Sequence, residues 1–136
     1  MLTENDVISI LSTYLTNQGY LIVKALNTGE RGIDLIAENF EHCLYIEAKG
    51  ETSSKDHTAR YGAPFNGNQI KSHVSRALLA AMLVLDEADG DPKVIAGIAL
   101  PDNPGHRSLA NRILRPVKSL GIRIFWVSQT GVEVQD

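Results

Sequence analysis

The fold is decided by Gly32-Ile33-Asp34 and Tyr45-Ile46-Glu47-Ala48-Lys49, two segments that set two acids and a lysine among apolar residues. Residues 32–38 and 43–49 both have the apolar composition of strands, and only residues 39–42 separate them. This spacing predicts an antiparallel hairpin. Side chains alternate across a strand, so Glu47 and Lys49 are expected to share one face.

The register of this hairpin brings the two acids together. A hairpin centred between Phe40 and Glu41 places Asp34 directly opposite Glu47. Opposed residues on one face have Cβ atoms about 4.5–5.5 Å apart, and like charges in such positions are destabilising. Lys49 can supply one compensating charge. A divalent cation held by both carboxylates can supply the rest, and hard oxygen ligands favour Mg²⁺ or Mn²⁺.

Helices are expected on both sides of this hairpin in the sequence. Apolar residues recur at helical spacing over residues 4–17, where Thr3 and Asp6 can form an N-terminal cap. The same spacing predicts a long helix over residues 67–87. Leu109, Ile113 and Val117 indicate a further helix, which we expect Pro116 to kink or end.

Further strands complete the predicted sheet. They are expected at residues 20–26, 94–100 and 122–127, and a short tail at residues 132–134 follows Gly131. Residues 94–100 are almost wholly apolar, which is typical of a central strand buried on both faces. The sequence therefore predicts an α/β fold with a mixed central sheet flanked by helices.

Composition limits the classes of protein that fit. The chain has 136 residues, of which 43% are hydrophobic and 21% charged, so we expect a single globular domain over residues 1–136. The single cysteine, Cys43, cannot form an internal disulfide or a multi-cysteine zinc site. No apolar run approaches the roughly 20 residues that cross a bilayer, and the first residues lack the basic start of a secretory signal. We therefore expect a cytoplasmic protein that has no membrane partner.

Charge alone does not identify a partner. The net charge of −3 gives no support from bulk composition to nucleic-acid binding. Residues 103–132 nevertheless contain no acid and five cations, namely Arg107, Arg112, Arg115, Lys118 and Arg123. These cations can form one basic surface, or they can be ordinary solvated side chains.

The order of elements, with G-x-D and E-x-K on one hairpin, resembles the PD-(D/E)xK nuclease superfamily, whose fold is restriction-endonuclease-like with an αβββαβ core. The chain is most similar in pattern to small Holliday-junction-resolvase-like and Mrr-like nucleases. The resemblance implies that Asp34, Glu47 and the backbone carbonyl of Ala48 bind Mg²⁺, with Mn²⁺ as the alternative, and that Lys49 is the catalytic lysine. Ile33 departs from the motif, because it replaces the proline before the aspartate.

Two other residues are candidates through the same resemblance. Glu4 lies on the apolar face of the first helix, where an acid in the similar resolvases reaches the metal site; alternatively, it interacts with the helix dipole. Gln69 matches a position where many members of the superfamily place a glutamine near the active site, with Lys71 close by. The alternative for Gln69 is a solvated residue in the first helical turn.

Contacts to DNA are expected from scattered cations. Residues 50–67 have little apolar periodicity and form a predicted flexible loop, in which Lys55 and Arg60 can contact phosphates, although it can also be a plain loop. Lys71, Arg112 and Arg115 are the other expected contacts.

The function expected from these features is that of a Mg²⁺-dependent endonuclease that hydrolyses DNA, as a homodimer if it cuts both strands. One alternative is a catalytically silent, nuclease-like module that binds DNA or a protein partner. The other is an enzyme for a different phosphate substrate, which is weakened by the absence of a glycine-rich phosphate loop.

Overall fold

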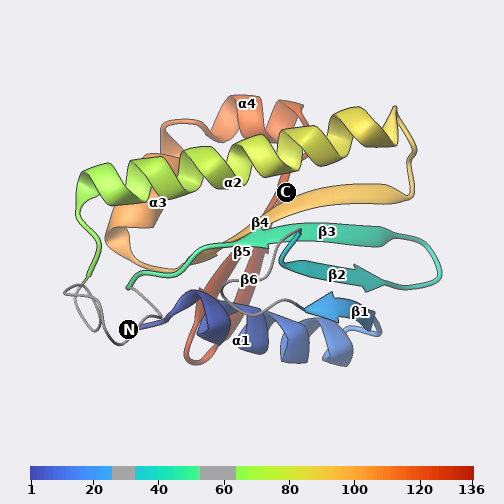
Figure 1. Ribbon diagram of the computed structural model, residues 1–136, viewed down its shortest axis with the longest axis horizontal. Helices are drawn as coiled ribbons and strands as arrows, with labels where there is room; N and C mark the ends of the chain where they lie inside the picture. Colours follow the sequence, from blue (N-terminus) through green and yellow to red (C-terminus); the bar gives the residue numbers. More distant parts are fainter. Residues whose placement is uncertain (26–32, 53–63) are drawn as a thin grey trace.

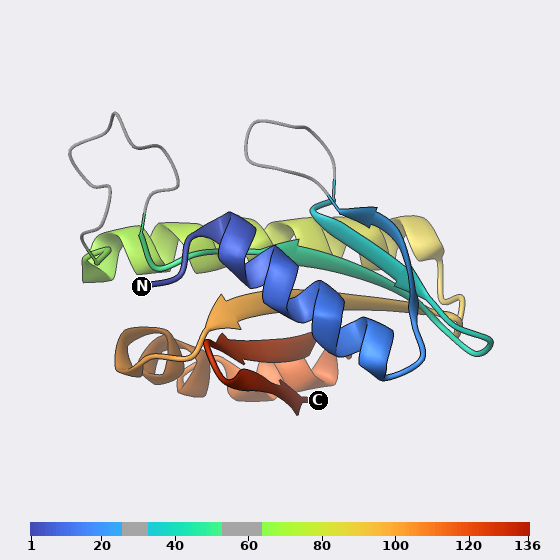
Figure 2. The same ribbon diagram turned by 90° about the horizontal axis from the view of Figure 1, so that it is seen from below.

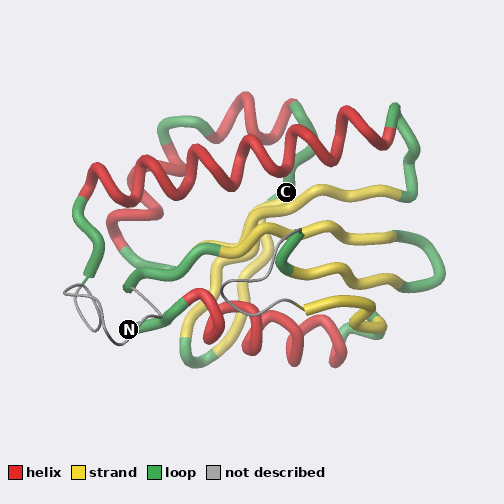
Figure 3. Tube along the Cα trace, in the orientation of Figure 1, coloured by secondary structure: helices red, strands yellow, loops and turns green. Residues whose placement is uncertain are grey.

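The computed structural model describes residues 1–25, 33–52 and 64–136, which form one mixed sheet with helices on both faces (Figures 1 and 3). The helices are α1 (Glu4–Asn17), α2 (Gly67–Ala88), α3 (Pro104–Asn111) and α4 (Leu114–Ser119). The strands are β1 (Leu21–Ala25), β2 (Leu35–Glu38), β3 (Cys43–Ala48), β4 (Val94–Pro101), β5 (Arg123–Ser128) and β6 (Gly131–Gln135). The order from α1 to β4 is the αβββαβ core, so the predicted fold class is confirmed.

The sheet has the strand order β1-β2-β3-β4-β5-β6. The pairs β3-β4 and β4-β5 are parallel, and the other pairs are antiparallel. In the β2-β3 hairpin, Leu35 pairs with Ile46 and Glu38 pairs with Cys43, which confirms the predicted register. Continued by one residue, this register places Asp34 opposite Glu47.

Two helical layers cover the sheet. Helix α1 packs on one face, and α2, α3 and α4 lie over the other (Figures 1 and 2). The alternate residues Leu44, Ile46 and Ala48 of β3 belong to the core beneath α1, so Glu47 faces the opposite side. Strand β4 is buried from Ala96 to Pro101, as its apolar sequence predicts.

Helix α1 begins as the sequence predicts. The Thr3 side chain accepts a hydrogen bond from the Asp6 N–H, and the Asp6 carboxylate accepts one from the Thr3 N–H. This capping box satisfies two N–H groups that the first helical turn leaves unpaired. None of the helices in the described ranges is both long and apolar enough to span a membrane.

Three sequence predictions differ from the structure. The second strand begins at Leu35 rather than at residue 32, so Asp34 lies at the end of a loop. The helix predicted around Leu109 and Val117 is two short helices, and the break precedes Pro116. Pro116 falls in the first turn of α4, where its missing N–H has no helical acceptor to lose. The predicted tail is a sixth strand paired with β5.

Candidate active site

Asp34 and Glu47 form a coupled acid pair at the end of the β2-β3 hairpin. Asp34 is only 9% exposed, and its Oδ2 accepts a hydrogen bond from the Ala48 N–H at 2.8 Å. When Glu47 is protonated, it also donates a hydrogen bond to Asp34. The two carboxyl groups are thus held together by the backbone of β3.

Burial is the main cause of the raised pKa values of both carboxyl groups. Desolvation, followed by the negative charge of Asp34, raises the pKa of Glu47 to about 7. Burial also raises the pKa of Asp34, although the Ala48 N–H and the Lys49 charge oppose the shift. A raised pKa means that the site disfavours its second negative charge. In the metal-free pair, Glu47 therefore loses its proton only around neutral pH.

Lys49 is the cation nearest to Glu47 in the described ranges. Its Nζ lies 3.9 Å from Glu47 Oε2, and the two side chains are 14% and 18% exposed. The Lys49 N–H also donates to the Ala99 carbonyl at 3.0 Å, which fixes the backbone at the end of β3. A separation of 3.9 Å is longer than a hydrogen bond, so the ammonium retains donors for another group.

Glu4 approaches this pair because the start of α1 docks against Gly50. A Cβ atom at residue 50 would lie 2.5 Å from the Glu4 nitrogen, so the approach requires glycine. The Leu2 carbonyl accepts a hydrogen bond from the Glu51 N–H at 2.9 Å, and the Leu2 N–H donates to Glu51 Oε1 at 2.8 Å. Burial and then the charge of Asp34 raise the pKa of Glu4, while Lys49 lowers it. Glu4 is therefore a third acid whose pKa depends on the charge of Asp34.

The donor atoms of this site fit a hard divalent cation. Mg²⁺ in proteins is commonly held by one or two carboxylates, with water and substrate phosphate as its other ligands. Asp34, Glu47 and the Ala48 carbonyl offer oxygen ligands of this kind, and the raised pKa values show that burial disfavours the charged form of both carboxyl groups. In residues 1–25, 33–52 and 64–136, no group of three or more His, Cys, Asp or Glu residues is close enough to hold a metal. Glu4 is thus near the pair without completing such a group.

Glu51 connects the beginnings of three helices, a role that the sequence analysis missed. Its main chain and carboxylate bind Leu2 before α1, and its carbonyl accepts the Phe65 N–H before α2 at 3.1 Å. Its Oε2 accepts a hydrogen bond from the side chain of Asn103, the N-cap of α3, at 2.8 Å. The sequence signal for a role of Glu51 is that it follows Lys49 by only two residues. Leu2 and Asn103 could not be foreseen as partners, because they lie about 50 residues away in opposite directions.

Two histidines, His73 and His106, also lie at this end of the sheet. His106 is fully buried, and burial lowers its pKa to about 4. The His73 ring packs perpendicular to Phe65 at a centroid distance of 4.6 Å. Burial and the nearby Lys49 lower the pKa of His73. Both histidines are therefore neutral near physiological pH.

The remaining predicted residues are distributed around the site. The Gln69 Oε1 accepts the Asn66 N–H at 2.9 Å in a capping box, which gives this side chain a structural role at the start of α2. Lys71 and Arg112 line one cavity of about 270 Å³ between α2 and α3. Arg115 is exposed on α4 and does not line that cavity. Lys55 and Arg60 lie outside the described residues.

The basic stretch is only partly available to a ligand. Arg107 donates to Asp102 at 2.8 and 3.0 Å and to Glu133, and its guanidinium lies 4.2 Å from the centre of the Trp126 ring. Arg123 pairs with Asp136 at 3.4 Å. Arg112, Arg115 and Lys118 form no ion pair with any described residue.

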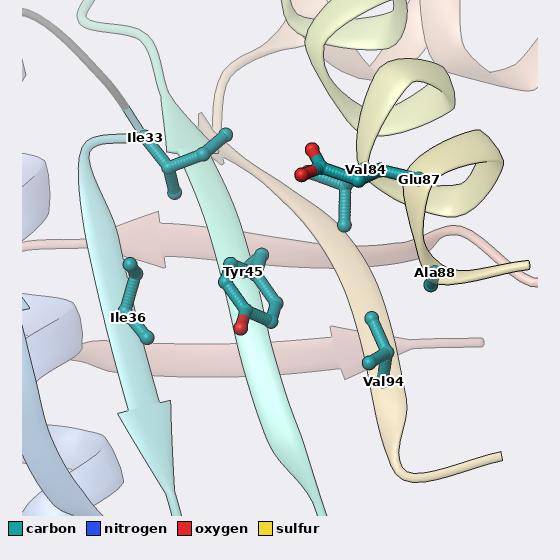
Figure 4. A pocket seen from close by; sticks show the side chains of 7 residues that line it. All are labelled: Ile33, Ile36, Tyr45, Val84, Glu87, Ala88 and Val94. Carbon is teal, nitrogen blue, oxygen red and sulfur yellow. The ribbon is translucent and has the colours of Figure 1, made fainter. Parts of the chain in front are cut away.

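A mostly apolar cavity of about 330 Å³ is separate from this chemistry. It lies between the hairpin and the C-terminal end of α2, where Tyr45, Ile36 and Val84 line it (Figure 4). Its lining includes Glu87 but none of Glu4, Asp34, Glu47 and Lys49. We therefore place the candidate active site at the acid pair rather than in this cavity.

Comparison with known proteins supports the fold alone. No protein-family model and no curated protein matches the chain. The crystal structure of an XisH family protein from Nostoc punctiforme PCC 73102 is similar, with a TM-score of 0.57 and 15% sequence identity. The match covers 98% of each chain. The described fold is therefore similar to that of a solved XisH family protein over nearly its whole length.

Proposed function

We propose that the protein is a divalent-metal-dependent nuclease that hydrolyses phosphodiester bonds in DNA. The observation that carries this proposal is the buried Asp34–Glu47 pair, whose negative charge Lys49 compensates only in part. An acid pair that resists its second ionisation gains most from a bound cation. The choice of DNA rests on the resemblance to PD-(D/E)xK nucleases.

The side chains have distinct proposed roles. Asp34, Glu47 and the Ala48 carbonyl would hold Mg²⁺ or Mn²⁺. When bound, such an ion supplies an activated water and stabilises the charge that develops on the phosphate. Lys49 orients the attacking water or donates to a phosphate oxygen, with the donors that its distance from Glu47 leaves free. Glu4 adds to the negative potential that attracts the cation.

The surroundings of the pair are suited to a phosphate backbone. The first turns of α1, α2 and α3 lie at the same end of the molecule, where β3 and β4 finish (Figure 1). The N-terminal ends of helices carry partial positive charge and free N–H groups, both of which favour anions. Lys71 and Arg112 add full positive charges beside this end. A net charge of −3 is compatible with such a local basic surface.

The decisive experiment is cleavage of linear, nicked and four-way DNA with Mg²⁺ and with EDTA. We expect cleavage with Mg²⁺ only, its loss in Asp34→Asn, and its retention in the matched surface variant Asp91→Asn, which alters an exposed acid beyond α2. Binding of DNA without cleavage would favour the silent module. Hydrolysis of nucleotides but not of DNA would favour the other phosphate enzyme.

A homodimer is a second part of this proposal. Cleavage of both strands of a duplex by one small nuclease requires two active sites, and one chain offers one acid pair in its described ranges. Light scattering during size-exclusion chromatography should give twice the chain mass of 14.9 kDa. A mass of one chain at cleavage-competent concentrations contradicts the dimer but leaves the nuclease proposal intact.

A further inference from the structure

A second cavity, of about 250 Å³, begins two residues beyond Lys49, at Glu51. Its walls are formed by the apolar side chains of Phe65, Ile70 and Pro104, and its polar lining comes from Glu51, Asn103 and His106. The volume is below the roughly 300–1,000 Å³ of cavities that hold drug-sized ligands, which favours a single ring system as occupant. The cavity thus combines apolar walls with a small number of fixed polar groups.

The polar side of this cavity presents hydrogen-bond acceptors. The Asn103 amide nitrogen donates to Glu51 Oε2 at 2.8 Å, which turns its Oδ1 toward His106. That Oδ1 lies 2.8 Å from His106 Nδ1, and since the amide oxygen can only accept, Nδ1 must carry the hydrogen. His106 Nε2 is then an unprotonated acceptor.

This acceptor has no partner of its own. His106 is 0% exposed, and its Nε2 has no hydrogen-bond partner in the described part of the chain. A buried polar atom without a partner is costly, but His106 is fully buried, so its Nε2 is out of reach of an occupant of the cavity. Glu51 is the acceptor that the cavity presents, with its orientation fixed by Leu2 and Asn103.

The cavity adjoins a second cavity that two cations line. Ile70 and Gly105 line both this cavity and the neighbouring one of about 270 Å³, to which Lys71 and Arg112 belong. A Cβ atom on Gly105 would lie 2.8 Å from Ile70 Cδ1, so the glycine permits the close contact at the boundary. Apolar walls, an acceptor and two cations thus line two adjoining cavities, which we call the trough.

We infer that this trough is a subsite for one unpaired nucleotide of a DNA strand, with its base beside Phe65 and Glu51 and its phosphate between Lys71 and Arg112. The inference rests on the proposal that DNA is the substrate, and it defines the substrate class as DNA with an unpaired or displaced nucleotide. Aromatic side chains stack on unpaired bases, and cations bind the backbone phosphates. The amino groups of cytosine, adenine and guanine are donors that the remaining lone pairs of the Glu51 carboxylate can accept. A base within a duplex is stacked and cannot enter.

The perpendicular His73 ring holds the Phe65 ring in place. A preformed stacking surface lowers the ordering cost of binding. Since Glu51 lines the cavity and follows Lys49 by two residues, the base would lie near the candidate active site.

The test is a binding measurement in EDTA, which removes cleavage from the result. Fluorescence anisotropy compares a short duplex containing one unpaired cytosine with the same duplex fully paired. We expect wild type to prefer the unpaired site, and Phe65→Ala to lose about fivefold or more of that preference, the value of one base stacked on an aromatic ring. Phe65→Tyr keeps the aromatic surface and should keep the preference. The matched control is Phe40→Ala, because Phe40 is fully exposed in the turn between β2 and β3.

The phosphate position is tested by Lys71→Ala against Lys93→Ala. Lys93 lies beyond the far end of α2, and that end is about 25 Å from Lys71 at 1.5 Å per helical residue. We expect weaker binding of the unpaired substrate in Lys71→Ala only. Equal affinity of wild type for the two duplexes, or an unchanged preference in a folded Phe65→Ala, overturns the inference and leaves water as the occupant of the cavity. Cleavage of paired DNA with no such preference would retain the nuclease proposal and reject the subsite.

Discussion

At the scale of single residues, the most informative feature is an acid pair that the fold holds in an unfavourable state. The Ala48 N–H fixes Asp34 at 2.8 Å, and Glu47 stands opposite it on the next strand. Proteins retain such local strain at functional sites, where a ligand relieves it. The acid pair therefore links stability to function, and the two can be measured separately.

The first prediction concerns Asp34→Asn. We expect cleavage to be lost while the melting temperature of the metal-free protein stays the same or rises by a few degrees, because opposed like charges cost up to about 1 kcal/mol. An asparagine Oδ1 can still accept the Ala48 N–H, so the backbone contact should survive. A melting temperature several degrees lower in EDTA contradicts the opposed-carboxylate geometry, whatever the activity.

The pKa of Glu47 gives a second prediction, for the stability of the metal-free protein. Its folded-state pKa of about 7 lies above the ordinary value of 4.5, so the native state binds more protons than the unfolded state between these values. Stability from this group is therefore greatest at low pH and is lost as the pH rises through about 7. Burial lowers the pKa values of His73 and His106, so the contribution of these two side chains to stability increases as the pH rises toward about 6.5. We expect chemical denaturation in EDTA to show wild type losing stability between about pH 6.5 and 8.5, and Glu47→Gln to lack this loss. Parallel curves for the two proteins would contradict the raised pKa.

The third prediction separates catalysis from binding at Lys49. Lys49→Ala should lower the cleavage rate by about 10²–10³-fold, the usual effect of removing one charge-stabilising donor, while DNA affinity and calorimetric Mg²⁺ affinity change little. An interaction made mainly in the transition state affects rate rather than ground-state binding. Collapse of Mg²⁺ affinity would instead make the lysine a structural counter-charge, and an unchanged rate would exclude it as the catalytic lysine.

The sequence was sufficient to predict that Asp34 and Glu47 lie opposite each other, but it did not predict which other residues lie near them. Asp34 and Glu47 are joined by one short hairpin, whose register follows from alternation and turn length. Glu51, His73 and His106 come together through three helix beginnings that are distant in the sequence. Residue types that are unremarkable in isolation acquire their chemistry there from burial, which periodicity does not encode.

At the scale of elements, the start of α1 is the part on which the site geometry depends most. Gly50 lets the main chain at Thr3 and Glu4 pass close to the end of β3, and the two Leu2–Glu51 hydrogen bonds fasten it. The amphipathic pattern of residues 4–17 predicts the helix, and the structure confirms it. The docking of its N-terminus could not be predicted, since the glycine has no positive φ or turn signal to mark it.

The fourth prediction follows from this docking. Gly50→Val should destabilise the fold by about 1–3 kcal/mol, the usual cost of overpacking, and should lower cleavage further by displacing Glu4 and Lys49. The clash is with backbone, 2.5 Å from the Glu4 nitrogen, and cannot be relieved by a side-chain rotation. The matched control is Gly67→Ala at the start of α2, where no atom lies within 4 Å of the added Cβ. Equal denaturation midpoints for the two variants would contradict the close approach.

The helical segment after β4 shows where periodicity misleads. Leu109, Ile113 and Val117 are spaced as in one helix, yet the chain divides into α3 and α4 before Pro116. Asn103 caps the start of α3, which ends at Asn111. The buried residues of this short helix are His106 and Ala110. Tertiary packing here overrides a pattern of only three residues.

At the scale of the whole molecule, charge is distributed unevenly, and this decides where a nucleic acid can lie. Arg107 and Arg123 are held by acids of the chain itself, whereas Lys71 and Arg112 face a common groove beside the three helix beginnings. The sequence shows that residues 103–132 contain five cations and no acid. It could not show which of these cations form ion pairs with acids elsewhere in the fold. Long-range attraction of DNA should therefore depend on a few cations rather than on all five.

The last prediction is the salt dependence of DNA binding. Each phosphate contact contributes about −0.9 to the slope of log affinity against log salt, so Arg112→Ala combined with Lys71→Ala should flatten the wild-type slope by nearly 2. Lys93→Ala should leave the slope unchanged, because Lys93 lies beyond the opposite end of α2. Arg107→Ala provides a second comparison: loss of its contacts to Asp102, Glu133 and Trp126 should lower stability rather than the slope. If the double variant keeps the wild-type slope, the backbone of DNA does not follow the Lys71–Arg112 groove. The same measurement on Lys55→Ala and Arg60→Ala would then assign the contact to the segment between β3 and α2.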